Sequence, residues 1–128
     1  MICVKVRVAE GIPPPVGNPF KLHCTEAVEL LPDKPVVVRT GLWIDVKAIP
    51  EVRLDDGFVA CGVGRSNGEL VVAVMWAGPT RSVLGKRERF GEAVLLDGAI
   101  AKVRFFLDDG SGGARVVTGN AVKVGKNE

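Results

Sequence analysis

MICVKVRVA, residues 1–9, alternates apolar side chains with charged ones. Side chains of a β-strand point in turn to opposite faces, so this pattern is typical of a strand with one buried face. The pattern returns in residues 100–107 (IAKVRFFL), where Ala101, Val103, Phe105 and Leu107 would face one way and Lys102 and Arg104 the other. Valine is abundant, and its branched side chain suits a pleated surface. The sequence therefore predicts an all-β protein.

Working outward, the rest of the chain divides into further short strands. They are predicted at residues 27–31, 36–39, 42–46, 58–63, 70–76 and 93–96, with one or two more within 115–124. Turns or loops are predicted at residues 32–35, 64–68, 78–85, 97–98 and 108–113. A sustained helical period is not found in any segment. Many short strands with frequent turn signals favour a sandwich, a jelly roll or a small barrel.

The chain organisation is simple. Its 128 residues fit one domain, 1–128, which is long enough to bury a core without disulfides or a metal. Residues 11–19 (GIPPPVGNP) contain three consecutive prolines, so they are expected to form an extended arm. Residues 125–128 are expected to be a frayed tail.

Composition and charge exclude several classes of protein. The net charge of +2 is too small to imply nucleic acid or a membrane as partner. The basic cluster of residues 81–89 is diluted by Glu88 and Glu92 and has no interleaved aromatic platform, so it does not favour nucleic-acid binding. A signal peptide is not visible, and the longest apolar run, residues 70–78, is too short to cross a bilayer. A soluble protein is expected.

Cysteine and histidine usage argues against a metal site. Cys3, Cys24 and Cys61 are widely spaced, and His23 is the only histidine, so a set of four zinc ligands is not expected, nor is any cofactor. Adjacent His23 and Cys24 would point to opposite faces of a strand, which disfavours a nucleophile and base pair. Free thiols indicate a reducing, cytoplasmic setting. The absence of glutamine is a faint signature of a thermophilic source.

Several segments, taken in order, resemble the motifs of the deoxyuridine triphosphatase (dUTPase) and dCTP deaminase superfamily. The first is residues 20–30 (FKLHCTEAVEL), followed by Pro32-Asp33, residues 36–39 and Thr40-Gly41-Leu42. The family has an aromatic-Asp-Leu strand here, then an acidic stretch, a turn and a Thr-Gly-Leu strand. Lys21 stands where the family has the aspartate that helps to hold magnesium near the triphosphate, and a lysine cannot take that role.

The second segment is residues 64–68 (GRSNG), which is similar to the family's Pro-Arg-Ser-Gly. The resemblance implies that Arg65 and Ser66 contact phosphate, and a forked guanidinium in a glycine-flanked loop suits phosphate oxygens. A plain hairpin turn with Asn67-Gly68 at its tip explains the same residues. The two interpretations are compatible.

Two later segments are weaker matches. Residues 87–93 (RERFGEA) are similar to the family's Gly-Asp-Arg-apolar-Ala-Gln, with Arg89 in the place of its arginine, although a charged loop before a strand fits equally well. Residues 112–119 (GGARVVTG) resemble the glycine-rich arm that closes over the nucleotide, with Ala114 in place of the phenylalanine that stacks on uracil. A hairpin between Leu107 and Val117 explains this segment without that role.

The catalytic part of the family pattern is missing. Gly68 runs directly into Glu69-Leu70, which leaves no room for the uracil-binding hairpin with its water-activating aspartate. The chain has no tyrosine to reject ribose. Asp55-Asp56 is the only similar acidic string, and it precedes Arg65, in the wrong order. The resemblance covers about residues 20–119.

The resemblance implies a distorted jelly-roll or β-barrel fold and a homotrimer with sites between subunits. Two functions are carried forward. In the first, the protein has lost nucleotide hydrolysis and serves as a structural or interaction module, with a remnant phosphate pocket at Arg65, Ser66 and Arg89. In the second, it is a divergent nucleoside triphosphate pyrophosphatase in which Asp55 or Asp56 replaces the lost acid. The sequence favours the first, because water activation needs a carboxylate placed near a metal-bound phosphate.

Overall fold

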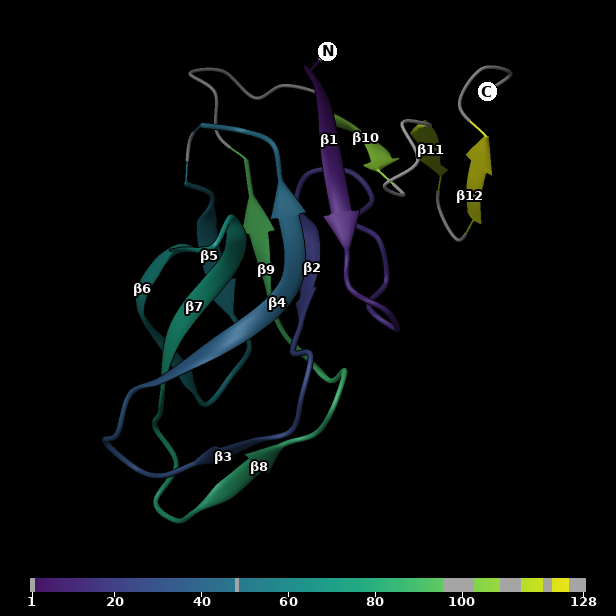
Figure 1. Ribbon diagram of the computed structural model, residues 1–128. Helices are drawn as coiled ribbons and strands as arrows, with labels where there is room; N and C mark the ends of the chain where they lie inside the picture. Colours follow the sequence, from purple (N-terminus) through teal and green to yellow (C-terminus); the bar gives the residue numbers. More distant parts are fainter. Residues whose placement is uncertain (1, 48, 96–102, 109–113, 119–120, 125–128) are drawn as a thin grey trace.

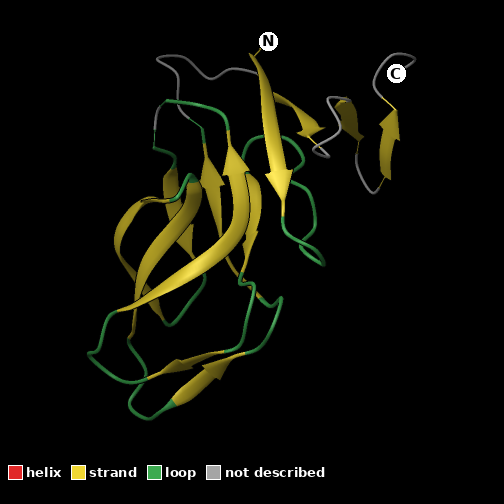
Figure 2. Ribbon diagram, viewed as in Figure 1, coloured by secondary structure: helices red, strands yellow, loops and turns green. Residues whose placement is uncertain are grey.

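The structure, a computed structural model, describes residues 2–47, 49–95, 103–108, 114–118 and 121–124. Every regular element in these ranges is a β-strand, so the all-β prediction is confirmed (Figures 1 and 2). The described residues include no helix that could span a membrane. The expected tail, residues 125–128, lies outside the described residues.

The largest layer is a seven-stranded sheet (Figure 1). Its strands, in spatial order, are β12 (Ala121–Val124), β11 (Ala114–Thr118), β10 (Val103–Asp108), β1 (Ile2–Val8), β4 (Val36–Ile44), β7 (Glu69–Trp76) and β6 (Phe58–Ser66). Neighbouring strands are antiparallel except β1 and β10, which are parallel. The pairing of β10 with β11 bears out the hairpin interpretation of the chain between Leu107 and Val117.

Two smaller sheets complete the described fold. One is three-stranded, in the order β2 (Phe20–His23), β9 (Arg89–Val94), β5 (Glu51–Leu54), and it lies behind β4 and β7 in Figure 1. The other pairs β3 (Val28–Leu30) with β8 (Ser82–Leu84) at the end of the molecule drawn lowest. The described residues do not form a closed barrel, because their hydrogen bonding divides into three sheets, and the distorted jelly roll stays a prediction.

The core lies between the seven-stranded and three-stranded sheets. Val4 and Val6 of β1 are buried while Lys5 and Arg7 are exposed, as the alternation predicts. Phe105 of β10 is 1% exposed and meets Phe20 of β2 edge to face, with ring centroids 5.4 Å apart. Contacts of this kind join the inner faces of both sheets into one apolar cluster.

Several predicted boundaries need correction. Residues 36–39 and 42–46 are not two strands, since β4 runs unbroken from Val36 to Ile44. The loop expected at 64–68 is shorter, because β6 continues to Ser66 and only Asn67 and Gly68 form the turn, both with positive φ. The strand expected at 93–96 begins at Arg89 instead. Strands β5 and β8 were missed, and with three or four residues each they are too short to display a period.

The Thr40-Gly41-Leu42 motif is a bulge in β4. Pairing with β7 shifts register between Arg39 and Trp43, and Gly41 adopts φ +69°. The buried carboxylate of Glu69 accepts hydrogen bonds from the Gly41 backbone N–H and the Arg39 Nε–H, both at 2.9 Å. The motif therefore bends a central strand, and a buried acid satisfies its backbone.

The proline arm, residues 11–19, is an extended segment fixed at both ends. Near its start, Ile12 is buried in the core. At its end, the Asn18 side chain donates to the Leu95 carbonyl and accepts from the Leu95 N–H, both at 2.8 Å. These contacts hold the arm beside β2.

Candidate functional site

Arg65 and Ser66 are the last two residues of β6, so their side chains leave the strand on opposite faces. Arg65 donates a hydrogen bond to the Val46 carbonyl and lines a pocket with residues of β1 and β4. Ser66 lines a different hollow, together with Arg39 and Val71. The structure does not bring the two predicted phosphate ligands into one pocket of the chain.

Arg89 lies in the three-stranded sheet, on β9, next to Asp55, one of the two acids proposed for catalysis. Its Nε is 3.6 Å from Oδ2 of Asp55, which follows β5 directly. Asp56 is exposed in the turn that leads to β6. The structure therefore joins Arg89 to Asp55 and leaves Arg65 with another set of neighbours.

The pocket that contains Arg65 has a charged lining and an aromatic wall. Its volume is about 510 Å³. The lining residues are Lys5, Arg7, Trp43, Ile44, Asp45, Arg65, Gly68 and Asp108. Trp43 lies directly opposite Arg7 in the pairing of β4 with β1, and the guanidinium carbon of Arg7 is 4.5 Å from the centroid of the Trp43 ring. We call this concavity the Trp43 pocket.

The backbone explains why these residues meet. Lys5 and Arg7 are two residues apart in β1, so both project from the face turned away from the core. The backbone N–H of Asp45 donates to the Lys5 carbonyl at 2.9 Å, which keeps the end of β4 beside β1. The turn at Asn67 and Gly68 passes below Trp43, and a Cβ at Gly68 would lie 3.4 Å from Trp43 Cδ1. Strands β1, β4, β6 and β10 thus contribute to the walls.

The electrostatics of the Trp43 pocket favour an anion. Three cationic side chains, Lys5, Arg7 and Arg65, face two carboxylates, Asp45 and Asp108, so the pocket carries a positive excess. A guanidinium stacked on an indole keeps its outward N–H groups available to oxygen acceptors. A phosphate group is the ligand that such a set suits best.

Sequence reasoning found only one member of the Trp43 pocket, Arg65. Lys5, Arg7 and Trp43 were missed as site residues, although the alternation of residues 1–9 already placed Lys5 and Arg7 on one outward face. The missing information was the pairing of β1 with β4, which brings Trp43 beside Arg7.

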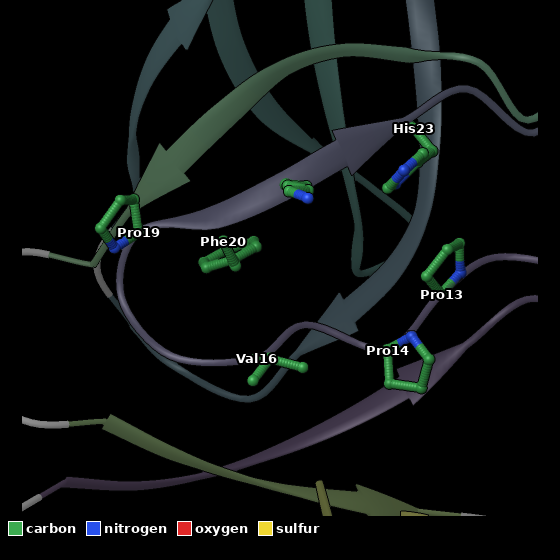
Figure 3. A pocket seen from close by; sticks show the side chains of 7 residues that line it. Pro13, Pro14, Val16, Pro19, Phe20 and His23 are labelled. Carbon is green, nitrogen blue, oxygen red and sulfur yellow. The ribbon is translucent and has the colours of Figure 1, made fainter. Parts of the chain in front are cut away.

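A second concavity lies between the proline arm and β2, and we call it the arm pocket. Its volume is about 390 Å³, and it is lined by Pro13, Pro14, Val16, Pro19, Phe20, Lys21 and His23. In Figure 3, His23 and Pro13 lie at one end and Pro19 at the other, with Val16 between them. Burial lowers the pKa of His23, and the nearby charges of Lys21 and Arg89 lower it further.

Cys24 follows His23 and is fully buried. Its thiol donates to the Gly85 carbonyl at 2.9 Å. Burial raises the pKa of the Cys24 thiol, against the lowering effect of hydrogen bonds from the backbone of Glu88 and Arg87. The thiol is therefore a packed structural group. Within the described ranges, no group of three or more His, Cys, Asp or Glu side chains could hold a metal ion.

Only part of the glycine-rich segment 112–119 is described. Ala114–Thr118 forms β11, which pairs with both β10 and β12. Comparison with known proteins adds nothing to these observations, since no family model matches the chain and no curated protein matches it.

Proposed function

We propose that this protein is a dUTPase-like β-protein that has lost nucleotide hydrolysis and serves as a binding or interaction module for phosphate-bearing ligands. One observation carries the proposal: Lys5, Arg7 and Arg65 converge on the Trp43 pocket. The proposed phosphate site therefore differs from the one predicted at Arg65, Ser66 and Arg89. Arg65 stays, Lys5 and Arg7 join it, and Arg89 belongs to the other sheet.

The chemistry of the Trp43 pocket suits phosphate without a metal. Guanidinium groups form paired hydrogen bonds with phosphate oxygens, and the lysine ammonium adds a mobile point charge. Trp43 offers an apolar surface beside these cations. Asp45 and Asp108 would repel part of the anionic charge, so the proposed affinity is modest.

Loss of hydrolysis is supported by where the acids and the phosphate ligands lie. Asp55 follows β5 of the three-stranded sheet, whereas the Trp43 pocket is built on β1, β4, β6 and β10 of the seven-stranded sheet. The Asp55 carboxylate is already beside Arg89, at 3.6 Å. A general base must lie within hydrogen-bond reach of the water that attacks phosphorus, so a base on another sheet does not serve this pocket.

The second candidate, a divergent nucleoside triphosphate pyrophosphatase, draws on the pairing of Asp55 with Arg89. An acid beside a cation, on the same sheet as Lys21, supplies two of the groups that a site handling phosphate and water needs. Under this alternative the reaction occurs on the three-stranded sheet, and the Trp43 pocket has no part in it.

The test combines binding and turnover. Calorimetric titration with inorganic triphosphate is expected to show saturable binding, weakened about threefold to tenfold by Lys5→Met or Arg65→Met, since each removes a charge-assisted contact. Arg81→Met is the matched control, because Arg81 is an exposed arginine that pairs with Glu29 on the β3–β8 sheet. This control should bind triphosphate like the unchanged protein.

Pyrophosphate release from dUTP, dCTP and the other nucleoside triphosphates with magnesium is measured alongside. The proposal expects no turnover. Robust turnover abolished by Asp55→Asn or Asp56→Asn would establish the pyrophosphatase instead. Equal triphosphate affinity in Lys5→Met, Arg65→Met and Arg81→Met would reject the Trp43 pocket as the phosphate site.

A further inference from the structure

The arm pocket has an apolar wall that is held in place by the contacts of the proline arm. Its apolar lining comes from the proline arm, and that arm is fixed by buried Ile12 at one end and by the paired hydrogen bonds of Asn18 with Leu95 at the other. Prolines have little backbone freedom, so the wall is preorganised. The pocket lies against β2 (Figure 3), on a different sheet from the Trp43 pocket.

Only two of the lining residues are polar, and they share one face of β2. Lys21 and His23 are two residues apart in this strand, so both side chains project to the side of the arm. Nδ1 of His23 is a buried side-chain atom without a hydrogen-bond partner in the described structure. The arm pocket therefore combines an apolar wall with a polar edge formed by these two side chains.

The charges around His23 come from all three strands of its sheet. Lys21 lies on β2, and β9 contributes Arg89, which pairs with His23 in register, and Glu92, which pairs with Lys21. From β5, Arg53 reaches Glu92 at 4.0 Å, and Asp55 reaches Arg89 at 3.6 Å. Each acid thus has a cation beside it, and the field felt at His23 is positive, as the lowering of its pKa by Lys21 and Arg89 indicates.

We propose that the arm pocket binds a small organic carboxylate with a compact apolar body, such as an aromatic or branched-chain acid. The apolar body packs against Pro13, Pro14 and Val16. One carboxylate oxygen accepts from an imidazole N–H of His23 on the part of the ring that lines the pocket, and the other accepts from the Lys21 ammonium. This site goes beyond the proposed phosphate binding and does not depend on it.

Other ligand classes fit the arm pocket less well. A cation would be repelled by Lys21 and Arg89. An uncharged apolar molecule would make no charge-assisted contact with Lys21 and His23 at the polar end. A bare phosphate would fill the polar end but leave the proline wall without a partner, whereas a compact organic acid uses both halves.

The proposal predicts a linked change in protonation. A bound carboxylate stabilises the imidazolium form of His23, so it raises the pKa of His23 above its value in the free protein. By the same linkage, the carboxylate binds more tightly as the pH falls through that range. His23 is the only histidine, so its ring protons report this titration without assignment ambiguity.

The experiment is an NMR pH titration of the His23 ring protons with benzoate as probe, at constant ionic strength maintained with chloride. Benzoate is expected to raise the pKa of His23 saturably, while benzamide, its neutral counterpart, and inorganic phosphate leave it nearly unchanged. Lys21→Met should weaken benzoate binding about fivefold, because it removes one exposed charge contact. Val16→Asp, at a site 41% exposed and therefore tolerant of change, should abolish it.

Lys34→Met is the matched control, since Lys34 is an exposed lysine in the turn after β3. It should bind benzoate like the unchanged protein. An unchanged pKa of His23 at saturating benzoate, or equal binding in Lys21→Met, Val16→Asp and Lys34→Met, would overturn the proposal. Triphosphate binding is measured on the same variants, and its retention in Lys21→Met separates failure here from failure of the Trp43 pocket.

Discussion

Glu69 has a structural role although it resembles a site residue. It is 4% exposed, and its two carboxylate oxygens are engaged by the Arg39 side chain and the Gly41 backbone. A buried charge with both oxygens satisfied stabilises the local backbone conformation. Thr40 is satisfied in the same region, because its hydroxyl donates to the Leu70 carbonyl at 2.6 Å. These contacts explain the most specific family-like motif of the chain as a strand bulge.

His23 makes stability depend on pH. Burial, Lys21 and Arg89 lower its pKa in the folded chain, while the unfolded value is about 6.5. Above that pH, His23 is neutral in both the folded and the unfolded chain, so it does not contribute to the pH dependence of the free energy of unfolding. As the pH falls below about 6.5, the unfolded chain binds a proton that the folded chain resists. The free energy of unfolding should therefore decrease from pH 7 to pH 5.5.

Urea unfolding at a series of pH values measures this effect. A His23→Gln variant, which cannot take up a proton, should lose most of the decrease between pH 7 and pH 5.5. An identical slope in both proteins would show that His23 is not the group responsible. Carboxylates titrate mainly below this window, so they do not obscure the comparison.

At the scale of elements, substitutions at two glycines with positive φ distinguish the cost of backbone strain from the cost of crowding by neighbouring side chains. Gly41 in the β4 bulge has φ +69°, and an added Cβ would lie 2.9 Å from side-chain atoms of Ala9, Ile12 and Thr25. Gly68 in the turn between β6 and β7 has φ +82°, and its nearest neighbour would be Trp43 at 3.4 Å. Gly68→Ala should cost about 1–2 kcal/mol from strain alone.

Gly41→Ala carries the same strain and adds overpacking of about 1–3 kcal/mol. The larger loss should appear as a lower urea midpoint for Gly41→Ala than for Gly68→Ala. Equal midpoints would mean that the core near the bulge relaxes freely around the added methyl group.

Strand β10 provides a second matched pair of substitutions, at two neighbouring phenylalanines. Phe105 is buried against Phe20, while the next residue, Phe106, faces the other way and is half-buried. Phe105→Ala should cost about 3–5 kcal/mol, as expected for a deleted core ring. Phe106→Ala should cost clearly less. Thermal unfolding compares the two, and an unchanged melting temperature for Phe105→Ala would contradict the packing of β10 on the core.

At the scale of the whole molecule, one sheet face is unusually apolar. Val37 and Val59 are 61% and 47% exposed, on the face of β4, β7 and β6 turned away from the core. Ala73 and Met75 of β7 share this face. The outer face of an antiparallel sheet is usually polar, so an apolar one marks a surface suited to association. The face therefore fits the proposal, based on family resemblance, that the chain forms a homotrimer.

Light scattering at tens of micromolar should give three times the chain mass of 13.6 kDa if assembly is obligate. Val37→Lys and Val59→Lys should shift the protein to monomer. Val83→Lys, at an equally exposed valine of β8, is the control and should leave the assembly intact. A monomer before any substitution would contradict the homotrimer that the family resemblance implies.

The sequence by itself determined the all-β class and, where the alternation is clear, the faces that the strands bury. Alternation is a local property, so Val4 and Val6 could be separated from Lys5 and Arg7, and Phe105 from Arg104, before any pairing was known. The hairpin turn at Asn67 and Gly68 was equally local, because glycine and asparagine tolerate the positive φ it needs.

Only the tertiary structure decided which strands are neighbours, and with them the sites. Ile2 pairs with Val103, which is 101 residues away along the chain, and Arg7 meets Trp43 only because β1 pairs with β4. Arg65 was predicted as a site residue, but its partners were not. The physical reason is that strand pairing minimises the free energy of the whole core, and distant residues contribute to it without leaving a local pattern.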